Sequence, residues 1–401
     1  MSSDPMPSSA VEAEQPNLKQ AAPSESKVPE PAKSDGGLDR RADVDAKQSW
    51  AAELLNRHQA ELLFVLEQAN FAWLTSGAAT RGLMSPEEHP LLCYSATQRW
   101  LVCGNFESQR MFDEELDGLG FLLKEWPWHA RRDRVVADLV RGRTVIADQA
   151  VDNAKVVGDD LRAARLALST YEQACLKQLG KLVVHCLEAT GRSATSGDTE
   201  RELAGQIAHR LLRYGVTPVN VSVSGDGRSR SYRRHGYTGL PVNRFGVLSA
   251  TGRKYGLYVT AARSFHFGQV DDALKAEQLA ACRVAATYAA SCWPDAMPRD
   301  ILTAAQRVYK LNNFEHEWEL SPQGYVTGRA PVEVRLDPST KDELRQNYAV
   351  TWGPAVGSAV CQDTLLVTEA GPVAITPTEN WGTATIKVAG AEFTCPYILE
   401  R

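Results

Sequence analysis

One short segment concentrates the side chains best suited to chemistry: Arg228-Ser-Arg-Ser-Tyr-Arg-Arg-His-Gly-Tyr-Thr238. A histidine can act as a general base because its ordinary pKa lies near neutral pH. His235 could therefore serve as the proton acceptor of a reaction. An exposed turn also concentrates glycine, serine and arginine, so a plain surface loop is an equally good interpretation of this segment.

Other reaction chemistries find little support. The eight cysteines are scattered and include no CxxC pair, which predicts neither a zinc knuckle nor a disulfide framework. No Gly-x-Ser-x-Gly elbow occurs, and Gly225-Asp-Gly227 lacks the lysine and the helix of a phosphate-binding loop.

The overall charge limits the partners. The 401 residues carry 44 Lys and Arg against 49 Asp and Glu, a net charge of −5, without a basic block. This balance argues against nucleic acid as a partner. No apolar run reaches the roughly 20 residues that span a bilayer, so no membrane partner is expected. We expect a soluble, cytoplasmic protein.

The pattern of elements predicts two domains after a tail. Residues 1–47 are rich in Pro, Ser, Ala and Glu, which predicts a disordered tail. Residues 48–158 alternate short apolar runs with helical segments, which favours a small α/β domain. Residues 159–401 combine long helices with strand-like runs and predict an α+β domain with an antiparallel sheet.

Three local predictions are specific enough to test. The apolar run Phe71–Leu74 is typical of a strand, and the spacing of leucines predicts one long helix over Asp159–Ala189. Thr199, followed three positions later by Glu202, predicts a capping box at the start of a helix.

The order of these elements resembles the pita-bread fold of creatinase, aminopeptidase P, prolidase and methionine aminopeptidase. Four segments between about residues 50 and 385 carry the resemblance: Asn70-Phe-Ala-Trp-Leu-Thr-Ser-Gly77, Asp160-Leu-Arg-Ala-Ala-Arg165, Gly256-Leu-Tyr-Val-Thr-Ala-Ala-Arg-Ser264, and Cys361-Gln-Asp-Thr-Leu-Leu-Val367 with the following Thr-Glu-Ala-Gly371. Each segment is weak alone, but their order and spacing agree with the family. The resemblance also implies a homodimer.

The resemblance implies a pair of metal ions held by two Asp, one His and two Glu, with a bridging water as nucleophile. Carried over residue by residue, the aspartates fall on Ser249 and Thr260, and the histidine falls on Ser321 or Pro322. The glutamates fall on Glu333 and Gln362. At most one ligand, Glu333, is retained. Neutral hydroxyl and amide groups cannot balance the charge of two divalent ions, so no metal and no other cofactor is expected.

The remaining site residues are also implied by the resemblance. A divergent, metal-poor branch of the family places His235 where the peptidases keep a substrate-facing histidine, and matches Gln323 and Glu333. Arg263 matches the arginine of the family's Thr-Arg pair, and is expected to form an ion pair with Glu333 or Asp363. The candidate residues of the site fall into two groups: catalytic His235 and Glu333, and substrate-binding Arg228, Arg234, Arg263, Gln323, Gln362 and Asp363.

Three functions stay open. The first is a pseudoenzyme that binds a small-molecule or peptide ligand, or acts as an assembly module. The second is a metal-independent hydrolase or lyase of a small molecule in the manner of creatinase, with His235 as the base and Glu333 as the anchor. The third is an active metal-dependent Xaa-Pro aminopeptidase whose ligands lie elsewhere in the sequence.

Overall fold

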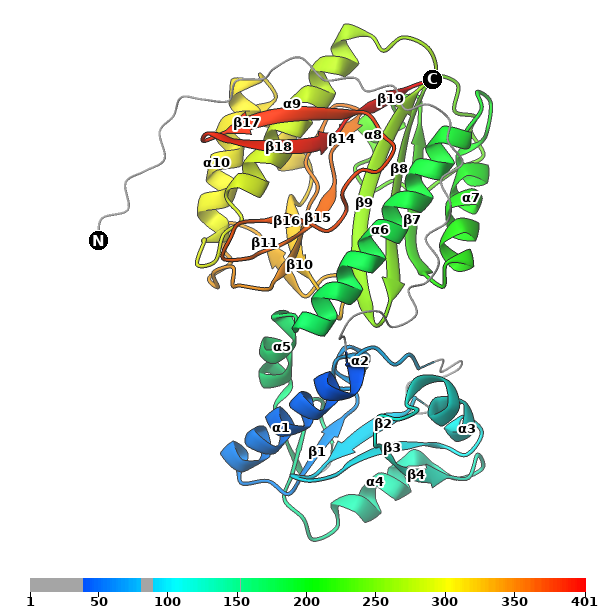
Figure 1. The fold of residues 1–401 in the computed structure, drawn as a ribbon, viewed down its shortest axis with the longest axis vertical. Helices are drawn as coiled ribbons and strands as arrows, with labels where there is room; N and C mark the ends of the chain where they lie inside the picture. Colours follow the sequence, from blue (N-terminus) through cyan, green and yellow to red (C-terminus); the bar gives the residue numbers. More distant parts are fainter. Residues whose placement is uncertain (1–38, 81–88, 152) are drawn as a thin grey trace, which may run out of the picture. The chain divides into compact units, whose positions relative to one another are not determined.

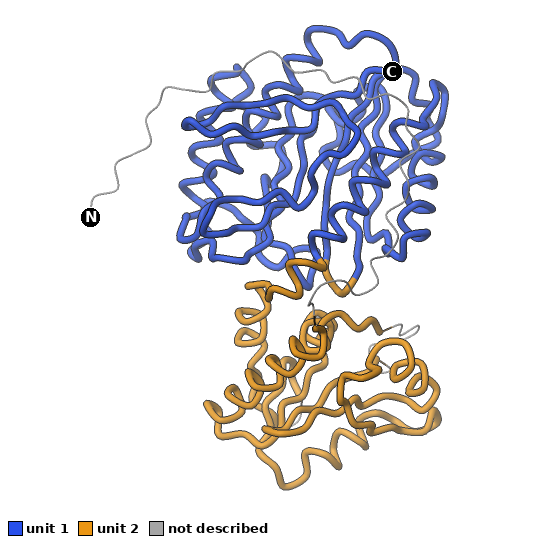
Figure 2. The backbone as a smooth tube through the Cα atoms, in the orientation of Figure 1, with its two compact units in different colours: residues 1–27, 176–254, 258–401 blue, residues 28–175, 255–257 orange. Residues whose placement is uncertain are grey.

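The computed structural model describes residues 39–80, 89–151 and 153–401, which form two compact units (Figure 2). The N-terminal unit contains the described residues up to 175 together with 255–257. The C-terminal unit contains residues 176–254 and 258–401. A compact unit is not by itself an independently folding domain. The predicted domain boundary between residues 158 and 159 therefore stays a prediction.

The N-terminal unit alternates strands and helices along the chain (Figure 1). Its elements are α1 Arg40–His58, β1 Leu62–Val65, α2 Gln68–Leu74, β2 Leu91–Tyr94, β3 Arg99–Gly104, α3 Ser108–Arg110, the π-helical turn η2 Met111–Glu115, β4 Leu122–Trp126, α4 Arg132–Val140, β5 Val145–Ala147, β6 Ala154–Val156 and α5 Gly158–Leu166.

The ordered part begins earlier than predicted, since residues 40–47 of the expected tail form the start of α1. Asp39 caps this helix by accepting hydrogen bonds from the first backbone N–H groups. Lys47 is buried and pairs with Asp43 at 2.6 Å and Glu172 at 2.8 Å. The charges that resembled a solvated tail are therefore partly paired inside the unit. The rest of the predicted tail, residues 1–38, lies outside the described residues.

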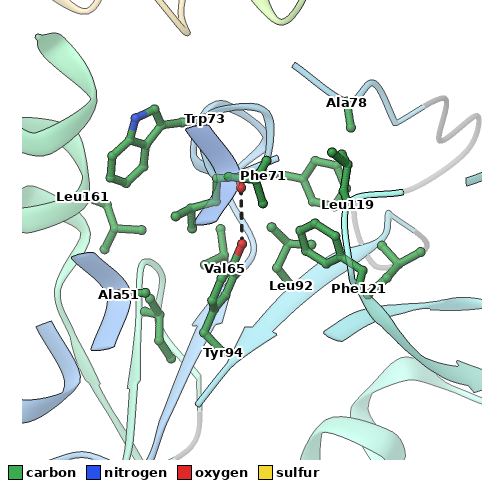
Figure 3. Packing of buried hydrophobic residues seen from close by; sticks show 14 of the residues in the cluster. Ala51, Val65, Phe71, Trp73, Ala78, Leu92, Tyr94, Leu119, Phe121 and Leu161 are labelled. Atoms are coloured by element: carbon green, nitrogen blue, oxygen red, sulfur yellow. Dashed lines mark hydrogen bonds between the residues drawn. The ribbon is translucent and has the colours of Figure 1, made fainter. Parts of the chain in front are cut away.

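The N-terminal unit is built on a mixed sheet with the strand order β4-β3-β2-β1-β5-β6. Phe71–Leu74 belongs to helix α2, so the predicted strand is wrong. An apolar run of four residues has no periodicity that separates a buried helix from a strand. Figure 3 shows why the run is apolar: Phe71 and Trp73 pack into the core, and the Tyr94 hydroxyl donates to the Leu74 carbonyl at 3.3 Å.

The predicted long helix over residues 159–189 is two helices, α5 and α6 Thr170–Ser193. The cause is a capping arrangement that starts α6. The Ser169 amide donates to Glu172 Oε2 at 2.9 Å, and the Glu172 amide donates to Ser169 Oγ at 3.2 Å. The predicted capping box of Thr199 and Glu202 is confirmed at the start of α7 Glu200–Arg213.

The C-terminal unit holds the second part of α6 and, apart from residues 255–257, the chain that follows it (Figure 1). Its further elements are β7 Thr217–Gly225, α8 Arg228–Ser231, β8 Phe245–Lys254, β9 Leu257–His266, α9 Asp272–Ala290, α10 Pro298–Leu311, the 3₁₀ turn η3 Glu315–Leu320, β10 Gly324–Thr327, β11 Val334–Leu336, β12 Ala349–Trp352, β13 Ala355–Val356, β14 Ala359–Val360, β15 Asp363–Leu366, β16 Val373–Ala374, β17 Thr383–Val388, β18 Ala391–Pro396 and β19 Ile398–Glu400.

Two sheets of this unit matter for the site. One has the order β19-β9-β8-β7, and α7 packs against β7 (Figure 1). The other has the order β11-β10-β12-β15-β16 and is antiparallel at each pairing. In the described ranges, no helix is both long and apolar enough to cross a membrane.

Candidate functional site

The C-terminal unit contains a cavity of about 590 Å³ between segments of both sheets. This volume is in the range of small-molecule and peptide sites. The lining is formed by β7, α8 and the segment after it, β8, β10, β11, β13, β14 and the loops that flank β10, β11, β13 and β14. Its residues are Asn220, Ser222, Ser229, Arg233, Arg234, His235, Gly236, Val247, Ser249, Ser321, Pro322, Gly324, Tyr325, Val332, Arg335, Gly353, Ala355, Val360 and Gln362.

The charged side chains that line the cavity are all basic. Among the described residues that line the cavity, none is an aspartate or a glutamate, while three are arginines and one is a histidine. The other polar groups are hydroxyls and amides. A cation entering this cavity would meet like charges and no carboxylate.

Three of the predicted degenerate ligand positions, Ser249, Ser321 and Gln362, line this cavity together. The Ser249 hydroxyl donates to Gln362 Oε1 at 3.1 Å. Gly353, which also lines the cavity, leaves space for the Gln362 side chain, because a Cβ there would lie 2.9 Å from Gln362 Nε2. Three positions that the resemblance singled out, far apart in the sequence, therefore lie together in the structure.

Thr260 lies buried beside the cavity rather than in its lining. Its hydroxyl is 2.8 Å from the Thr251 hydroxyl and accepts a hydrogen bond from the Tyr325 hydroxyl at 3.1 Å. The position thus belongs to a network of neutral groups in which each hydroxyl satisfies its neighbour.

Glu333, the one ligand expected to survive, does not join these residues. Its carboxylate accepts from the backbone N–H groups of Arg329 and Ala330, at 3.0 and 2.9 Å, and so closes the turn between β10 and β11. Glu333 is not among the residues that line the cavity, and its match to a metal ligand stays a prediction. Arg263, expected as a possible partner of Glu333, pairs with other carboxylates.

The donor set does not fit a pair of divalent ions. Ser249, Thr260, Ser321 and Gln362 supply neutral oxygens that already bond within the protein or face the cavity, and no carboxylate replaces them. Hydroxyl groups would need to lose protons to compensate two doubly charged ions. We therefore assign no step of chemistry to metals at this place.

His235 lies in the cavity wall in a defined orientation. Its Nδ1 atom is 3.1 Å from the Tyr232 carbonyl and donates to it, while Nε2 is buried with no partner among the described residues. Burial lowers the pKa of His235, outweighing the Tyr232 carbonyl that favours the charged form. The imidazole is therefore neutral near pH 7, with a free acceptor at Nε2.

The segment that carries His235 is attached to the sheet at several points. The Ser222 hydroxyl donates to the His235 carbonyl at 2.7 Å. Arg228 forms a two-point pair with the buried Glu200, at 2.7 and 2.8 Å. Glu200 also accepts from the amide and hydroxyl of Thr238 at 2.7 Å each. Arg228 thus holds the loop in place and does not line the cavity.

Arg234 and Arg335 present their charge to the cavity. Both are exposed lining residues, and within the described part of the chain neither side chain has a hydrogen-bond or ion-pair partner. Arg335 lies opposite Tyr325 in the β10–β11 pair, so both side chains share the cavity face of the sheet. Arg234 was predicted for the site, and Arg335 was not.

Arg263 is one of the most deeply buried charges described, with 1 % of its surface exposed. It donates to Asp363 at 3.0 Å and to Glu188 at 3.4 Å. Burial raises the pKa of Asp363 to about 6, although the Arg263 charge opposes this. The expected ion pair between Arg263 and Asp363 therefore forms, and neither residue lines the cavity.

Gln323 is likewise a packing residue of the wall. Its Oε1 accepts from the hydroxyls of Tyr288 and Tyr309 at 3.1 and 2.9 Å, and its Nε2 donates to the Ser321 carbonyl at 2.8 Å. Since these bonds use both ends of the buried amide, Gln323 supports the cavity wall and is not available to a ligand.

One cluster was missed by the sequence because its members are far apart. In residues 39–80, 89–151 and 153–401, the one group of three or more Cys, His, Asp or Glu side chains close enough to share an ion consists of Cys282, Cys361 and Cys395, with sulfurs within 4.8 Å of one another. The Cys282 and Cys395 thiols donate to the carbonyls of Pro396 and Cys282 at 3.5 Å each.

Comparison with known proteins identifies the fold. No family model matches the sequence, and no curated protein sequence matches it. Solved structures do match. The prolidase from Pyrococcus horikoshii OT3 is 16 % identical, with a TM-score of 0.70 over 83 % of this chain and 99 % of that chain. The dipeptidase PepE from Mycobacterium ulcerans is 17 % identical, with a TM-score of 0.69 over 86 % of this chain and 98 % of that chain.

A third match is not described as a peptidase. It is the N-terminal domain of the FACT complex subunit SPT16 from Cicer arietinum (chickpea), 11 % identical, with a TM-score of 0.62 over 85 % of this chain and 97 % of that chain. At such identities a structural match establishes the fold and not the activity. The predicted resemblance is thus confirmed in its fold: this chain has the pita-bread architecture shared by prolidases, Xaa-Pro peptidases and the SPT16 N-terminal domain.

Proposed function

We propose that this protein is a pseudoenzyme of the pita-bread fold, which binds a small-molecule or peptide ligand in the cavity of the C-terminal unit without metallopeptidase chemistry. One observation carries the proposal: Ser249, Ser321 and Gln362 line a cavity to which no described aspartate or glutamate contributes. Two divalent ions lose their hydration when they bind, and a site without negatively charged oxygens cannot offset that cost in free energy.

The alternative of an active Xaa-Pro aminopeptidase is weaker for the same reason. Its water nucleophile would depend on ions that this donor set does not favour. The match to the SPT16 domain supports a role in binding or assembly, since that protein is described as a subunit of a complex. A homodimer and a cytoplasmic location stay predictions.

A metal-independent hydrolase or lyase stays a second candidate because of one feature, the unpartnered Nε2 of His235. A neutral imidazole in that orientation can accept a proton from a bound water or substrate. The predicted anchor, Glu333, is engaged in the turn between β10 and β11. Such an enzyme would therefore need to hold its substrate through other residues of the cavity.

A turnover screen separates the three functions. The full chain is incubated with Xaa-Pro dipeptides and with creatine-like amidines, in the presence of Mn²⁺, Co²⁺ or Zn²⁺ and in the presence of a chelator. We expect no hydrolysis in any arm. Peptide hydrolysis that a chelator abolishes would establish the metallopeptidase. Chelator-resistant turnover that is lost in His235→Ala would establish the metal-independent enzyme.

A further inference from the structure

The arginines around the cavity fall into two classes. Arg233 pairs with Glu317 and donates to the Gly357 carbonyl at 2.7 Å, and Arg228 pairs with Glu200. Arg234 and Arg335 have no such partners among the residues described. Two guanidinium groups reach the same cavity from different segments, so their charge is available to a ligand.

The lining offers one further donor to an oxyanion. The hydroxyls of Ser222, Ser249 and Tyr325 already donate within the protein, whereas the amide nitrogen of Gln362 can donate to a ligand. Arginine matches carboxylate and phosphate oxygens through its planar fork of donors.

The same lining disfavours a free amine. A peptide with a free N-terminus brings an ammonium group, which needs a carboxylate or several acceptors once water is removed. None of the described lining residues is acidic, and the positive charges of Arg234 and Arg335 repel a cation. His235 Nε2 can instead accept a hydrogen bond from a neutral N–H or O–H group of a ligand.

We propose that the cavity binds an oxyanion that lacks a free amino group, either a carboxylate or a phosphate, through Arg234 and Arg335. This inference rests on the proposed function, because it requires a cavity without a metal pair. It makes the ligand an anion, in contrast to the zwitterion that a free dipeptide would be.

Calorimetric titration of the full chain tests the proposal with four probes. These are N-acetyl-dialanine, its C-terminal amide, free dialanine and inorganic phosphate. The variants are Arg234→Ala and Arg335→Ala. The matched control is Arg307→Ala, which removes an exposed arginine on α10 that does not line the cavity. Thermal unfolding of each variant verifies that it folds.

We expect N-acetyl-dialanine or phosphate to bind, and the one that binds identifies the source of the oxyanion. Each cavity substitution should weaken Kd about tenfold, equivalent to about 1.4 kcal/mol. The Arg307→Ala protein should bind as the unmodified chain does. Where N-acetyl-dialanine binds, its amide and free dialanine should bind at least about tenfold more weakly, a difference of about 1.4 kcal/mol.

Three results would overturn the proposal: neither anion binds, the amide or free dialanine binds as tightly as the acid, or Arg307→Ala weakens binding as much as the cavity substitutions. The failure of this inference is distinct from failure of the proposed function. If the protein binds no metal, has no peptidase activity and binds neither anion, only the proposal of an oxyanion ligand is contradicted. Stoichiometric metal with chelator-sensitive peptidase activity contradicts both.

Discussion

The C-terminal unit uses arginine in two opposite ways. Arg263 lies in the core beside β15, and its donors are used by Asp363, Glu188 and backbone carbonyls. Arg234 and Arg335 line the cavity, and neither has a partner among the residues the structure describes. The first arrangement stabilises a buried charge, whereas the second leaves charge exposed to whatever enters the cavity.

This difference separates an arginine that stabilises the fold from arginines that are available to bind a ligand. A buried ion pair constrains the protein because removing one partner leaves a charge without solvation. An exposed arginine contributes little to stability. Ligand binding, rather than the stability of the fold, can therefore determine which residue occupies such a position. Substitutions in the two groups should therefore separate stability from binding.

The largest expected effect follows from Arg263→Met. This variant leaves the buried Glu188 and the partly buried Asp363 without their shared cation. We expect the free energy of unfolding to fall by about 3–5 kcal/mol. Urea unfolding of the full chain measures it. A loss below about 1 kcal/mol, the scale of an exposed pair, would show that the network is not structural.

The pH dependence of stability comes next. The folded-state pKa of Asp363 is raised to about 6, whereas its ordinary value is 3.8. Between these values the native state holds a proton that the unfolded chain has released, so the Asp363 contribution falls as pH rises from about 4 to about 6. The total is up to about 3 kcal/mol.

Urea unfolding across this pH range, on the unmodified chain and on Asp363→Asn, isolates that contribution. The asparagine cannot titrate, so the variant should show a flatter decline between pH 4 and pH 6. Identical slopes for both proteins would mean that Asp363 titrates normally in the folded state.

A smaller effect is expected for Glu200→Gln. The carboxylate of Glu200 accepts from Arg228, Gly225 and Thr238, and these bonds together outweigh burial and hold its pKa below the ordinary value. An amide cannot accept all of them, so the free energy of unfolding should fall by about 2 kcal/mol.

The neighbouring Glu202 provides a matched control. It lies exposed in the capping box of α7, where glutamine can replace glutamate. Glu202→Gln should therefore cost less stability than Glu200→Gln in the same thermal or urea measurement. The reverse order would refute the role given to Glu200 in fixing the segment that carries His235.

The smallest change in stability is expected for Arg234→Ala and Arg335→Ala. Because each side chain is exposed and has no described partner, the free energy of unfolding should change by less than about 0.5 kcal/mol. A loss comparable with that of Arg263→Met would place these arginines in the structural group. The comparison between the two groups would then be invalid.

The sequence predicted the fold better than the local elements. Four motifs in the order that the family shows were enough to predict the architecture, since each motif marks one segment of the fold. The short run Phe71–Leu74 was misassigned because burial on all sides removes the periodicity that separates strand from helix. The break at Ser169 depends on a serine and a glutamate whose capping role is visible only in three dimensions.

For the candidate site, the family resemblance predicted several residues that line the cavity, but not the groups with which the predicted residues form hydrogen bonds. It brought Ser249, Ser321 and Gln362 to one cavity, together with His235. It did not predict that the Glu333 carboxylate accepts from two backbone donors in the turn between β10 and β11, because no sequence pattern marks those donors. Arg335 was missed as a lining residue, since a lone arginine on a short strand has no distinguishing spacing.

The central claim is that the cavity has lost the capacity to hold a pair of divalent ions. Its most direct test is equilibrium dialysis of the full chain against MnCl₂, followed by metal analysis and by a crystal structure read for anomalous density near Ser249, Thr260 and Gln362. We predict no stoichiometric metal and no peak among these side chains. Two bound ions per chain at this place would contradict the account.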